Sequence, residues 1–243
     1  HEEETVFMPI PFVVLIILDG WGLAPNSPGN AISQANLPNL RTYLSAYPHT
    51  TLTASGEAVG LPRGEGGNTE TGHLNLGAGR VVYQDLLRIN MSISDGSFFK
   101  NTTLISAIEH AKKNNSNLHL MGLVGSGGVH SNIDHLFALI NLCKQQNFNR
   151  VFLHLFTDGR DSPPNMAISY LQKVENFLQT TGVGTIASIM GRYWSLDRDF
   201  RWERTQTAYR ALTRGEGLLT AEYKIEIEKS YEKGITDEFL EPL

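Results

Sequence analysis

The amino-acid sequence predicts an α/β fold built on a mainly parallel β-sheet. Four apolar runs have the composition of buried strands, and each leads into a polar loop that contains glycine. Segments with helical apolar spacing lie between and after them. Continuous apolar runs are typical of parallel strands covered on both faces, and the alternation of strands and helices is typical of α/β domains. The 243 residues, 41% of them hydrophobic, are enough for a substantial core and exclude a disordered protein.

Each element has a local signal. The strands are expected at Phe12–Leu18, Leu118–Val124, Val151–Phe156 and Val183–Ile189. Apolar residues repeat with helical spacing in five segments: Thr103–Lys113, Ile133–Cys143, from Pro163 and Pro164 to Leu178, about Arg201–Leu212, and Thr220–Lys233. Ser131 or Asn132 is expected to cap the second of these helices, and the two prolines are expected to open the third.

The segment Gly56–Arg80 differs from the rest of the chain. It holds eight glycines and little apolar content before Leu74. Glycine lets the backbone turn sharply and approach a ligand closely. This composition predicts an extended functional loop rather than core.

Charge and composition limit the class of function. With 20 basic and 25 acidic residues the formal net charge is −5, which argues against a nucleic-acid-binding surface as the main role. The apolar runs are too short to span a bilayer, and the acidic start lacks the basic flank of a signal peptide, so a cytoplasmic protein with no membrane partner is expected. The single cysteine, Cys143, excludes an internal disulfide and is expected to be a buried thiol.

Polar side chains follow the predicted strands. Asp19 follows the first strand, His130 the second, Arg160 and Asp161 the third, and Arg192 the fourth. Sites in open α/β sheets form outside the carboxyl ends of the strands, so these side chains are expected to build one. Arginine binds phosphate and carboxylate through a planar fork, which favours a small anion as the ligand.

The arginine-rich segment Arg192–Arg214 has two interpretations. It holds six arginines with acidic residues interleaved. This pattern fits a salt-bridged, solvated face as well as an anion site. Arg192 directly follows a strand and is the stronger ligand candidate than the later Arg201 and Arg204.

Thr69 also has two interpretations. In Gly66–His73 it belongs either to a turn-rich surface loop with a helix cap or to a nucleophile held on a tight turn. A threonine hydroxyl needs a base or a metal to act as a nucleophile. Asp19 is a plausible oxygen ligand for Mg²⁺ or Mn²⁺ and, taken alone, is equally well a turn or cap residue.

Taken together, these motifs resemble one family, the cofactor-independent phosphoglycerate mutases of the alkaline-phosphatase superfamily. The resemblance runs in order over Phe12–Pro242. The matching segments are Leu18–Gly22, Pro48–Pro62, Asn68–Arg80, Gly127–Ser131, Ile133–Leu139, Asp158–Asp161, Gly191–Tyr193, Asp197–Asp199, Arg201–Arg204 and Thr236–Phe239.

The resemblance implies that 3-phosphoglycerate and 2-phosphoglycerate are interconverted through a phospho-enzyme in glycolysis and gluconeogenesis. It implies two divalent metals, usually manganese, and no bisphosphoglycerate cofactor. It places Thr69 as the nucleophile and Asp19 and Thr69 at the metals. By the same matching motifs, the residues that hold phosphoglycerate are His130, Arg160, Asp161, Arg192 and Arg198. Asp161 is also implied to lie close to the acid–base work.

The resemblance further implies an organisation into two domains. Residues 8–83 correspond to the first segment of an alkaline-phosphatase-like domain, and residues 84–243 to a transferase domain that is incomplete at its C-terminal end. The sequence is about half the length of a family member, so a C-terminal half with most metal ligands is expected as a partner, and the chain alone is expected to be inactive. Where the family has serine, this chain has Thr69. Two alternatives remain. The short sequence leaves open a non-catalytic half, and Thr69 leaves open a sister phosphomutase or phosphatase with a threonine nucleophile.

Overall fold

The computed structural model describes residues 12–243, and the chain divides into two compact units. The first unit ends at Tyr83, and the second runs from Gln84 to Leu243. The predicted start of the first domain at residue 8 lies outside the described residues. Each unit is described by itself below.

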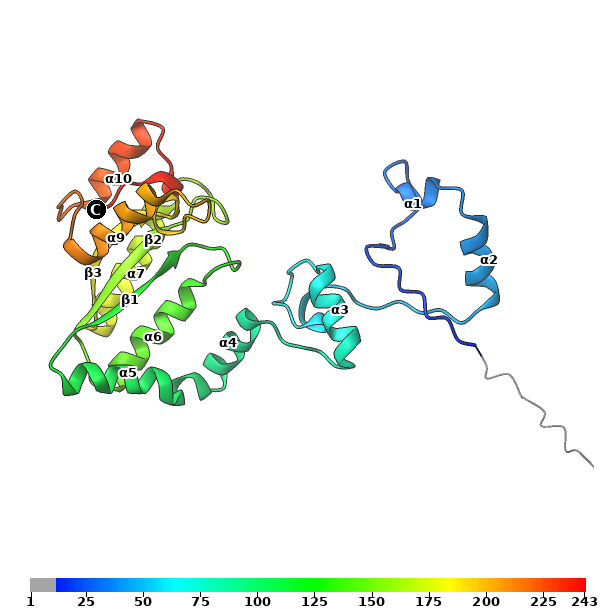
Figure 1. Ribbon diagram of the computed structural model, residues 1–243, viewed down its shortest axis with the longest axis horizontal. Helices are drawn as coiled ribbons and strands as arrows, with labels where there is room; N and C mark the ends of the chain where they lie inside the picture. The colour runs from blue at the N-terminus through cyan, green and yellow to red at the C-terminus, as the bar shows by residue number, and fades with distance from the viewer. Residues whose placement is uncertain (1–11) are drawn as a thin grey trace, which may run out of the picture. The chain divides into compact units, whose positions relative to one another are not determined.

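The first unit contains short helices (Figure 1). They are α1 (Ala31–Gln34), α2 (Pro38–Ala46), the 3-10 helix η1 (Gly56–Val59) and α3 (Thr69–Ala78). The predicted loop over Gly56–Arg80 is therefore wrong in part, because η1 and α3 lie within it. The local cause is Asn68, whose side chain accepts a hydrogen bond from the Thr71 amide at 2.9 Å and so caps α3.

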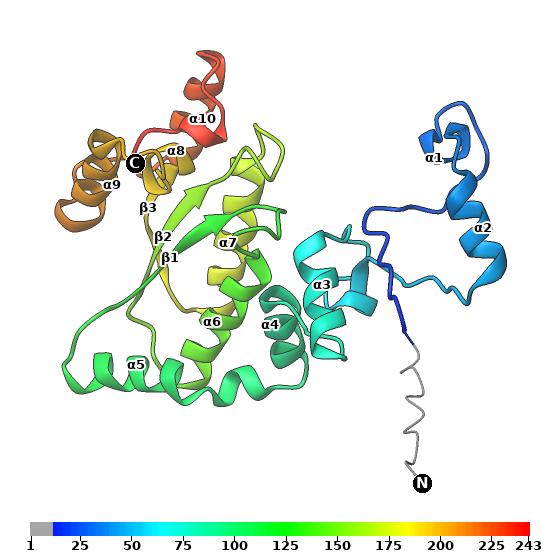
Figure 2. The same cartoon turned by 45° about the vertical axis from the view of Figure 1, so that its right-hand side comes forward.

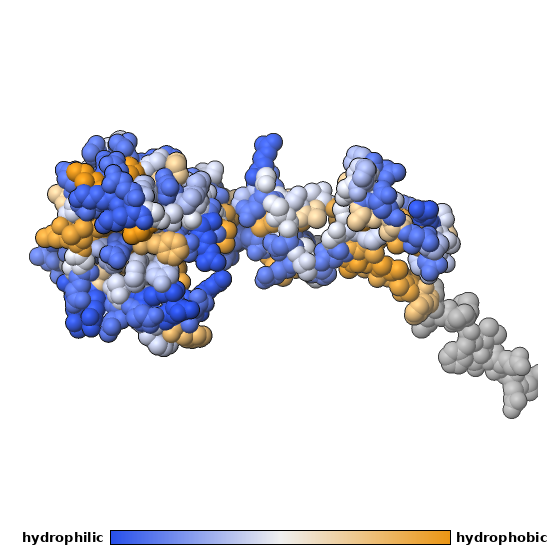
Figure 3. Space-filling view, turned by 90° about the horizontal axis from the view of Figure 1, so that it is seen from above, coloured by the Kyte–Doolittle hydropathy of each residue, from blue (hydrophilic) through white to orange (hydrophobic). Residues whose placement is uncertain are grey.

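The predicted strand at Phe12–Leu18 is not formed. These residues are extended but exposed, from 92% at Phe12 to 43% at Leu18, and they form the orange stretch beside the grey residues in Figure 3. A β-strand needs a neighbouring strand to pair its backbone polar groups. Residues 12–83 contain no β-strand, so the apolar run has no pairing partner there.

The second unit is an α/β domain, as predicted, although the strand expected at Val183–Ile189 begins and ends later, at Thr185–Gly191. Three parallel strands, β1 (Leu118–Val124), β2 (Val151–Thr157) and β3 (Thr185–Gly191), form a sheet in the order β1-β2-β3. Leu118 lies opposite Val151, and Thr157 lies opposite both Val124 and Gly191. Because the strands are parallel and in this register, their carboxyl ends lie at one edge.

Helices surround this sheet. They are α4 (Asp85–Ser94), η2 (Ser97–Lys100), α5 (Thr102–Lys113), α6 (Ile133–Gln145), α7 (Ala167–Thr181), α8 (Arg192–Ser195), α9 (Trp202–Arg214), α10 (Tyr223–Glu232) and η3 (Asp237–Phe239). In Figure 2, α6 and α7 lie on one side of the sheet and α9 on the other. Side chains alternate between the faces of a strand, so Leu155 packs into the larger core with α6 and α7, whereas Phe156 packs with α9.

The five predicted helices are present, but several of their ends differ, most of all the starts of α7 and α10. Asn132, rather than Ser131, caps α6 through its side chain and the Asp134 amide. Pro163 and Pro164 do not open α7, which begins at Ala167. The prolines lie in the connection instead, where the Pro164 carbonyl accepts a hydrogen bond from the Asp237 amide at 2.8 Å.

Two further expectations concern burial. Cys143 is 1% exposed, and burial raises the pKa of its thiol to about 11. Within residues 12–243, none of the helices combines the length and the apolar character that crossing a bilayer requires.

Candidate functional site

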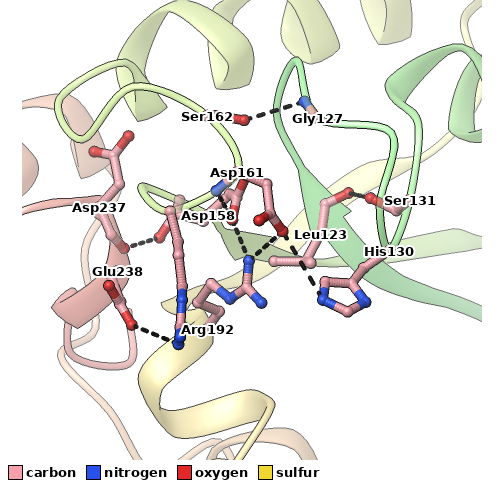
Figure 4. Close-up of polar contacts among 12 residues, drawn as sticks. Leu123, Gly127, His130, Ser131, Asp158, Asp161, Ser162, Arg192, Asp237 and Glu238 are labelled. Atoms are coloured by element: carbon pink, nitrogen blue, oxygen red, sulfur yellow. Dashed lines mark hydrogen bonds and ion pairs between the residues drawn. The ribbon is translucent and has the colours of Figure 1, made fainter. Parts of the chain in front are cut away.

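The carboxyl ends of the three strands carry a cluster of charged side chains (Figure 4). Arg192 begins α8 directly after β3, Asp158 and Asp161 lie in the turn after β2, and His130 lies in the loop after β1. The order of the strands in the sheet therefore brings together residues that are up to 62 positions apart in the sequence.

Arg192 lies at the centre of this cluster. Its Nη1 atom lies 2.6 Å from Asp158 Oδ1 and 2.7 Å from Asp161 Oδ2. The Arg192 and Asp158 side chains are 10% and 5% exposed, whereas that of Asp161 is 26% exposed. Asp158 is thus a buried anchor for the guanidinium, and Asp161 is the partner that solvent and ligands can reach.

The pKa shifts reflect this pairing. Burial by itself would raise the pKa of Asp158, but hydrogen bonds from Arg192 and Ser162 outweigh it and hold the pKa below its ordinary value. Burial by itself would lower the pKa of Arg192, and the hydrogen bonds to Asp161 and Asp158 raise it instead. The buried pair is therefore fully ionised at neutral pH.

The other predicted site residues of this unit are more exposed. His130 Nε2 lies 3.9 Å from Asp161 Oδ2, and its side chain is 45% exposed. Arg160 is 59% exposed, and its Nη1 lies 3.7 Å from Glu238 Oε1 in η3. His130, Asp158 and Asp161 line a small hollow with Gly127. The structure thus brings His130 and Arg192 together through their shared neighbour Asp161.

Arg198 is not part of this cluster. It lies in the exposed segment between α8 and α9, and within residues 12–243 its side chain has no hydrogen bond or ion pair. The neighbouring Asp197 instead pairs with Arg204 at 3.4 Å, and the Arg204 guanidinium stacks 3.7 Å above the Tyr193 ring. Arg204 is therefore held by contacts within the second unit, whereas Arg198 is not.

A second pair of predicted residues meets within the first unit. Thr69 is the first residue of α3, and its Oγ1 donates a hydrogen bond to Asp19 Oδ2 at 2.7 Å. Both residues are exposed. A hydroxyl at a helix N-terminus is favourably placed for an anion, because the helix dipole is positive there.

The Asp19–Thr69 pair has the donor atoms that suit a divalent metal, but it offers too few ligands. Carboxylate and hydroxyl oxygens are the donors that Mg²⁺ and Mn²⁺ prefer. In the part of the chain that the structure describes, however, there is no group of three or more His, Cys, Asp or Glu side chains that could hold a metal ion. The two side chains alone are therefore too few to hold a divalent ion.

Sequence reasoning missed three residues that hold the cluster in place. Asp158 anchors Arg192, Ser162 Oγ accepts hydrogen bonds from the Ser126 and Gly127 amides at 3.0 and 3.3 Å, and Glu238 pairs with Arg160. Asp158 follows the buried strand β2 directly, which is the signal that could have found it. Ser162 and Glu238 act through contacts that no local pattern reveals.

Comparison with known proteins identifies the family. The family model described as "BPG-independent PGAM N-terminus" matches residues 89–243. A 2,3-bisphosphoglycerate-independent phosphoglycerate mutase from Moorella thermoacetica is 57% identical over 230 residues, which are 95% of this chain and 45% of the relative. The chain belongs to this family. A second such mutase, from Desulforudis audaxviator, is 54% identical over the same share of both chains.

A solved structure agrees with this assignment. Phosphoglycerate mutase of Leishmania mexicana, crystallised at low cobalt concentration, matches with a TM-score of 0.67 and 28% identity. The match covers 93% of this chain and 43% of that chain. The chain thus spans somewhat less than half the length of the cofactor-independent mutases that it matches, and it corresponds to their N-terminal part.

Proposed function

We propose that this chain is the N-terminal half of an enzyme that interconverts 3-phosphoglycerate and 2-phosphoglycerate through a phosphothreonine intermediate. The observation that carries the proposal is the 2.7 Å hydrogen bond from Thr69 Oγ1 to Asp19 Oδ2. It couples the proposed nucleophile to a carboxylate that can take its proton or share a metal with it. The similarity to relatives named as phosphoglycerate mutases supports the same reaction.

The proposed reaction begins with transfer to Thr69. Its Oγ1 forms a bond to the phosphorus of the bound substrate, while the bond from phosphorus to the glycerate oxygen breaks. The Thr69 proton leaves toward Asp19 Oδ2, and the departing glycerate oxygen receives a proton from Asp161. After the glycerate has reoriented, Asp161 takes the proton from its other hydroxyl, whose oxygen forms a bond to phosphorus. The bond from phosphorus to Thr69 Oγ1 breaks, and Oγ1 takes back its proton from Asp19.

The second unit holds the substrate in this proposal. His130, Arg160, Arg192 and Arg198 would bind its phosphate and carboxylate groups. Arg192 is already oriented by the buried Asp158, so its position would change little on binding, whereas the Asp161 contact is accessible to solvent and exchangeable. Arg160 would exchange its 3.7 Å contact with Glu238 for the ligand.

Two divalent metals, with manganese expected and no bisphosphoglycerate required, complete the proposal. Asp19 and Thr69 would contribute to holding them, together with ligands from a C-terminal half. When bound, the metals would stabilise the Thr69 alkoxide and the charge of the transferring phosphoryl group. Because this chain supplies so few metal ligands, we expect it to be inactive alone, and we expect glycolysis and gluconeogenesis in the cytoplasm as the setting of the whole enzyme.

Reconstitution tests the proposal. Conversion of 3- to 2-phosphoglycerate is measured with manganese, first for the chain alone and then after addition of the part of the Moorella thermoacetica relative that the chain does not cover. We expect no turnover alone and turnover in the mixture. Thr69→Ala should abolish it, and the matched variant Thr69→Ser, which keeps the hydroxyl, should retain it. Full turnover by the chain alone, or by Thr69→Ala in the mixture, would contradict the proposal.

A further inference from the structure

Asp237 is a buried carboxylate that the proposed reaction does not use. It lies at the start of η3 and is 1% exposed. Its Oδ2 accepts a hydrogen bond from the Met166 amide at 2.9 Å, and its Oδ1 accepts one from the Tyr231 hydroxyl. Its own amide donates to the Pro164 carbonyl at 2.8 Å, and its carbonyl accepts from Thr157 Oγ1 at 2.6 Å. One residue thus ties η3 to β2, to the connection before α7 and to α10.

This arrangement has an electrostatic cost. The hydrogen-bond partners of the Asp237 carboxylate are neutral groups, a hydroxyl and an amide. Burial raises the pKa of Asp237, although the hydrogen bonds from Tyr231 and Met166 act in the opposite direction, and the nearby Asp158 raises it further. An apolar residue would avoid this cost but would remove the acceptor of both the Met166 amide and the Tyr231 hydroxyl, so the carboxylate's role here lies in these two hydrogen bonds.

The backbone that Asp237 fixes lies directly against the charged cluster. Gly159, with φ of +63°, follows Asp158 in the turn after β2. A Cβ atom on Gly159 would lie 2.7 Å from the Glu238 nitrogen and 2.9 Å from Asp237 Cβ. A Cβ atom on Gly191, which precedes Arg192, would collide with the Glu238 carbonyl. The loops that carry both halves of the cluster therefore pack on the backbone of η3 without space for a side chain.

The side chain after Asp237 continues this contact. Glu238 Oε1 lies 3.7 Å from Arg160 Nη1, and the Glu238 side chain is 22% exposed. The two neighbouring side chains thus make different contacts. Asp237 is hydrogen-bonded within the interior, whereas Glu238 contacts Arg160, a proposed substrate-binding residue. Figure 4 shows both residues beside the Asp158–Asp161 turn.

From these contacts we infer that Asp237 is a positioning residue for the turn Asp158–Ser162. By fixing η3 against Met166, Tyr231 and Thr157, it sets the backbone on which Gly159 and Gly191 rest, and so the positions of Arg160, Asp161 and Arg192. The link from this positioning to phosphoglycerate rests on the function proposed above. The positioning itself is a property of the free chain and can be measured without substrate.

The first measurement uses amide hydrogen exchange of the free 243-residue chain. Asp237→Leu keeps the volume and removes both acceptors, and Asp237→Asn keeps an acceptor for Met166. Tyr231→Phe removes the hydroxyl donor. The matched control is Tyr223→Phe, because Tyr223 lies in the same helix with its hydroxyl beside Glu175. We expect exchange in residues 158–162 to accelerate about tenfold in Asp237→Leu and less in Tyr231→Phe, while the β2 amides keep their protection.

Two results would overturn the inference. If the turn amides keep their protection in Asp237→Leu, η3 does not position the turn. If the amides of the turn and of β2 accelerate equally, Asp237 contributes to global stability and not to positioning. Restored protection in Asp237→Asn, together with an unchanged control, would support the specific role of the hydrogen-bond acceptor.

The second measurement adds 3-phosphoglycerate to the same variants and follows amide shifts of the turn by NMR. We expect Asp237→Leu to weaken the affinity about tenfold and Asp237→Asn to restore most of it. An unmodified chain that shows no binding would count against the proposed substrate residues, whereas the exchange data would still decide the positioning role. Unchanged affinity in Asp237→Leu with a loosened turn would overturn the link between positioning and substrate.

Discussion

Replacing Arg192 with methionine is the sharpest test of the charged cluster. The change removes the guanidinium that lies 2.6 Å from Asp158 and 2.7 Å from Asp161 but keeps much of the apolar stem. Asp161 can turn toward water, whereas the Asp158 side chain is 5% exposed and cannot. Breaking a buried pair by removing one partner costs about 3–5 kcal/mol, so at pH 7 the second unit should lose about 3 kcal/mol of its unfolding free energy.

The pH dependence of this loss has a definite sign. Burial would raise the pKa of Asp158, but hydrogen bonds from Arg192 and Ser162 hold it below the ordinary value. The ionised Asp158 therefore stabilises the unmodified chain above its unfolded pKa, about 3.9, and this contribution is lost as the pH falls through the folded pKa. In Arg192→Met the guanidinium is absent, and burial then raises the pKa of Asp158. Protonation of Asp158 in acid therefore removes the unpaired buried charge that destabilises the variant. The difference between the two proteins should shrink as the pH falls toward 4.

The assay is urea-dependent hydrogen exchange of the β2 and β3 amides, which reports the opening of the second unit. Arg214→Met is the matched control, because Arg214 is 64% exposed and its contact with Glu216 is 3.7 Å long. We expect it to change the stability by less than about 0.5 kcal/mol. Adding Asp158→Asn to Arg192→Met should recover part of the loss, since no buried charge remains. A loss at pH 7 no larger than that of the control, or one that does not shrink in acid, would refute the reasoning.

Three further predictions concern other parts of the chain. Gly159→Ala should destabilise the second unit by about 2 kcal/mol in urea unfolding, because its φ is +63° and its Cβ would lie 2.7 Å from the Glu238 nitrogen, whereas Gly122→Ala, with open space around it, should be near neutral. Iodoacetamide at pH 8 should leave Cys143 unmodified in the folded chain and alkylate it in urea, because burial raises the pKa of the thiol to about 11; rapid reaction of the folded chain would contradict this. Asn68→Ala should cost α3 about 1 kcal/mol, seen as faster exchange of its amides, since it removes the side-chain acceptor of the Thr71 amide; unchanged exchange would show that the cap contributes nothing.

The strands show what a sequence pattern can and cannot predict. The apolar run Leu118–Val124 is a strand at the residues expected, because β2 lies beside it and completes its hydrogen bonds. The run Phe12–Leu18 has the same character and forms none, since residues 12–83 offer no strand to pair with. An apolar run thus reports that a segment needs to be buried, and the presence of a partner decides whether it is a strand.

The site divides along the same line. His130, Asp161 and Arg192 could be predicted to meet because each lies in the segment that follows a strand, and parallel strands share an edge. The contact of Thr69 with Asp19 spans 50 residues; the residues alone left each with a second, structural interpretation, and the family resemblance favoured a shared site. The support of the turn by Asp237 depends on contacts with residues up to 80 positions away, which no local pattern encodes. The α3 helix was not predicted, because glycines are frequent in its sequence and disfavour helices. Asn68, a residue type typical of helix N-caps, was the local signal for it.

The exposed run Phe12–Leu18 has a consequence for the behaviour of the chain in solution. Its seven residues are aliphatic or aromatic, and they contain no charge, proline or glycine. Extended segments of this kind stack between identical molecules into cross-β assemblies. Asp19, which follows directly, places a negative charge at the end of each stacked segment and opposes such assembly. We therefore expect Asp19, the residue proposed to hold a metal, to oppose aggregation as well, so that Asp19→Asn should make the chain less soluble and less able to bind the ion.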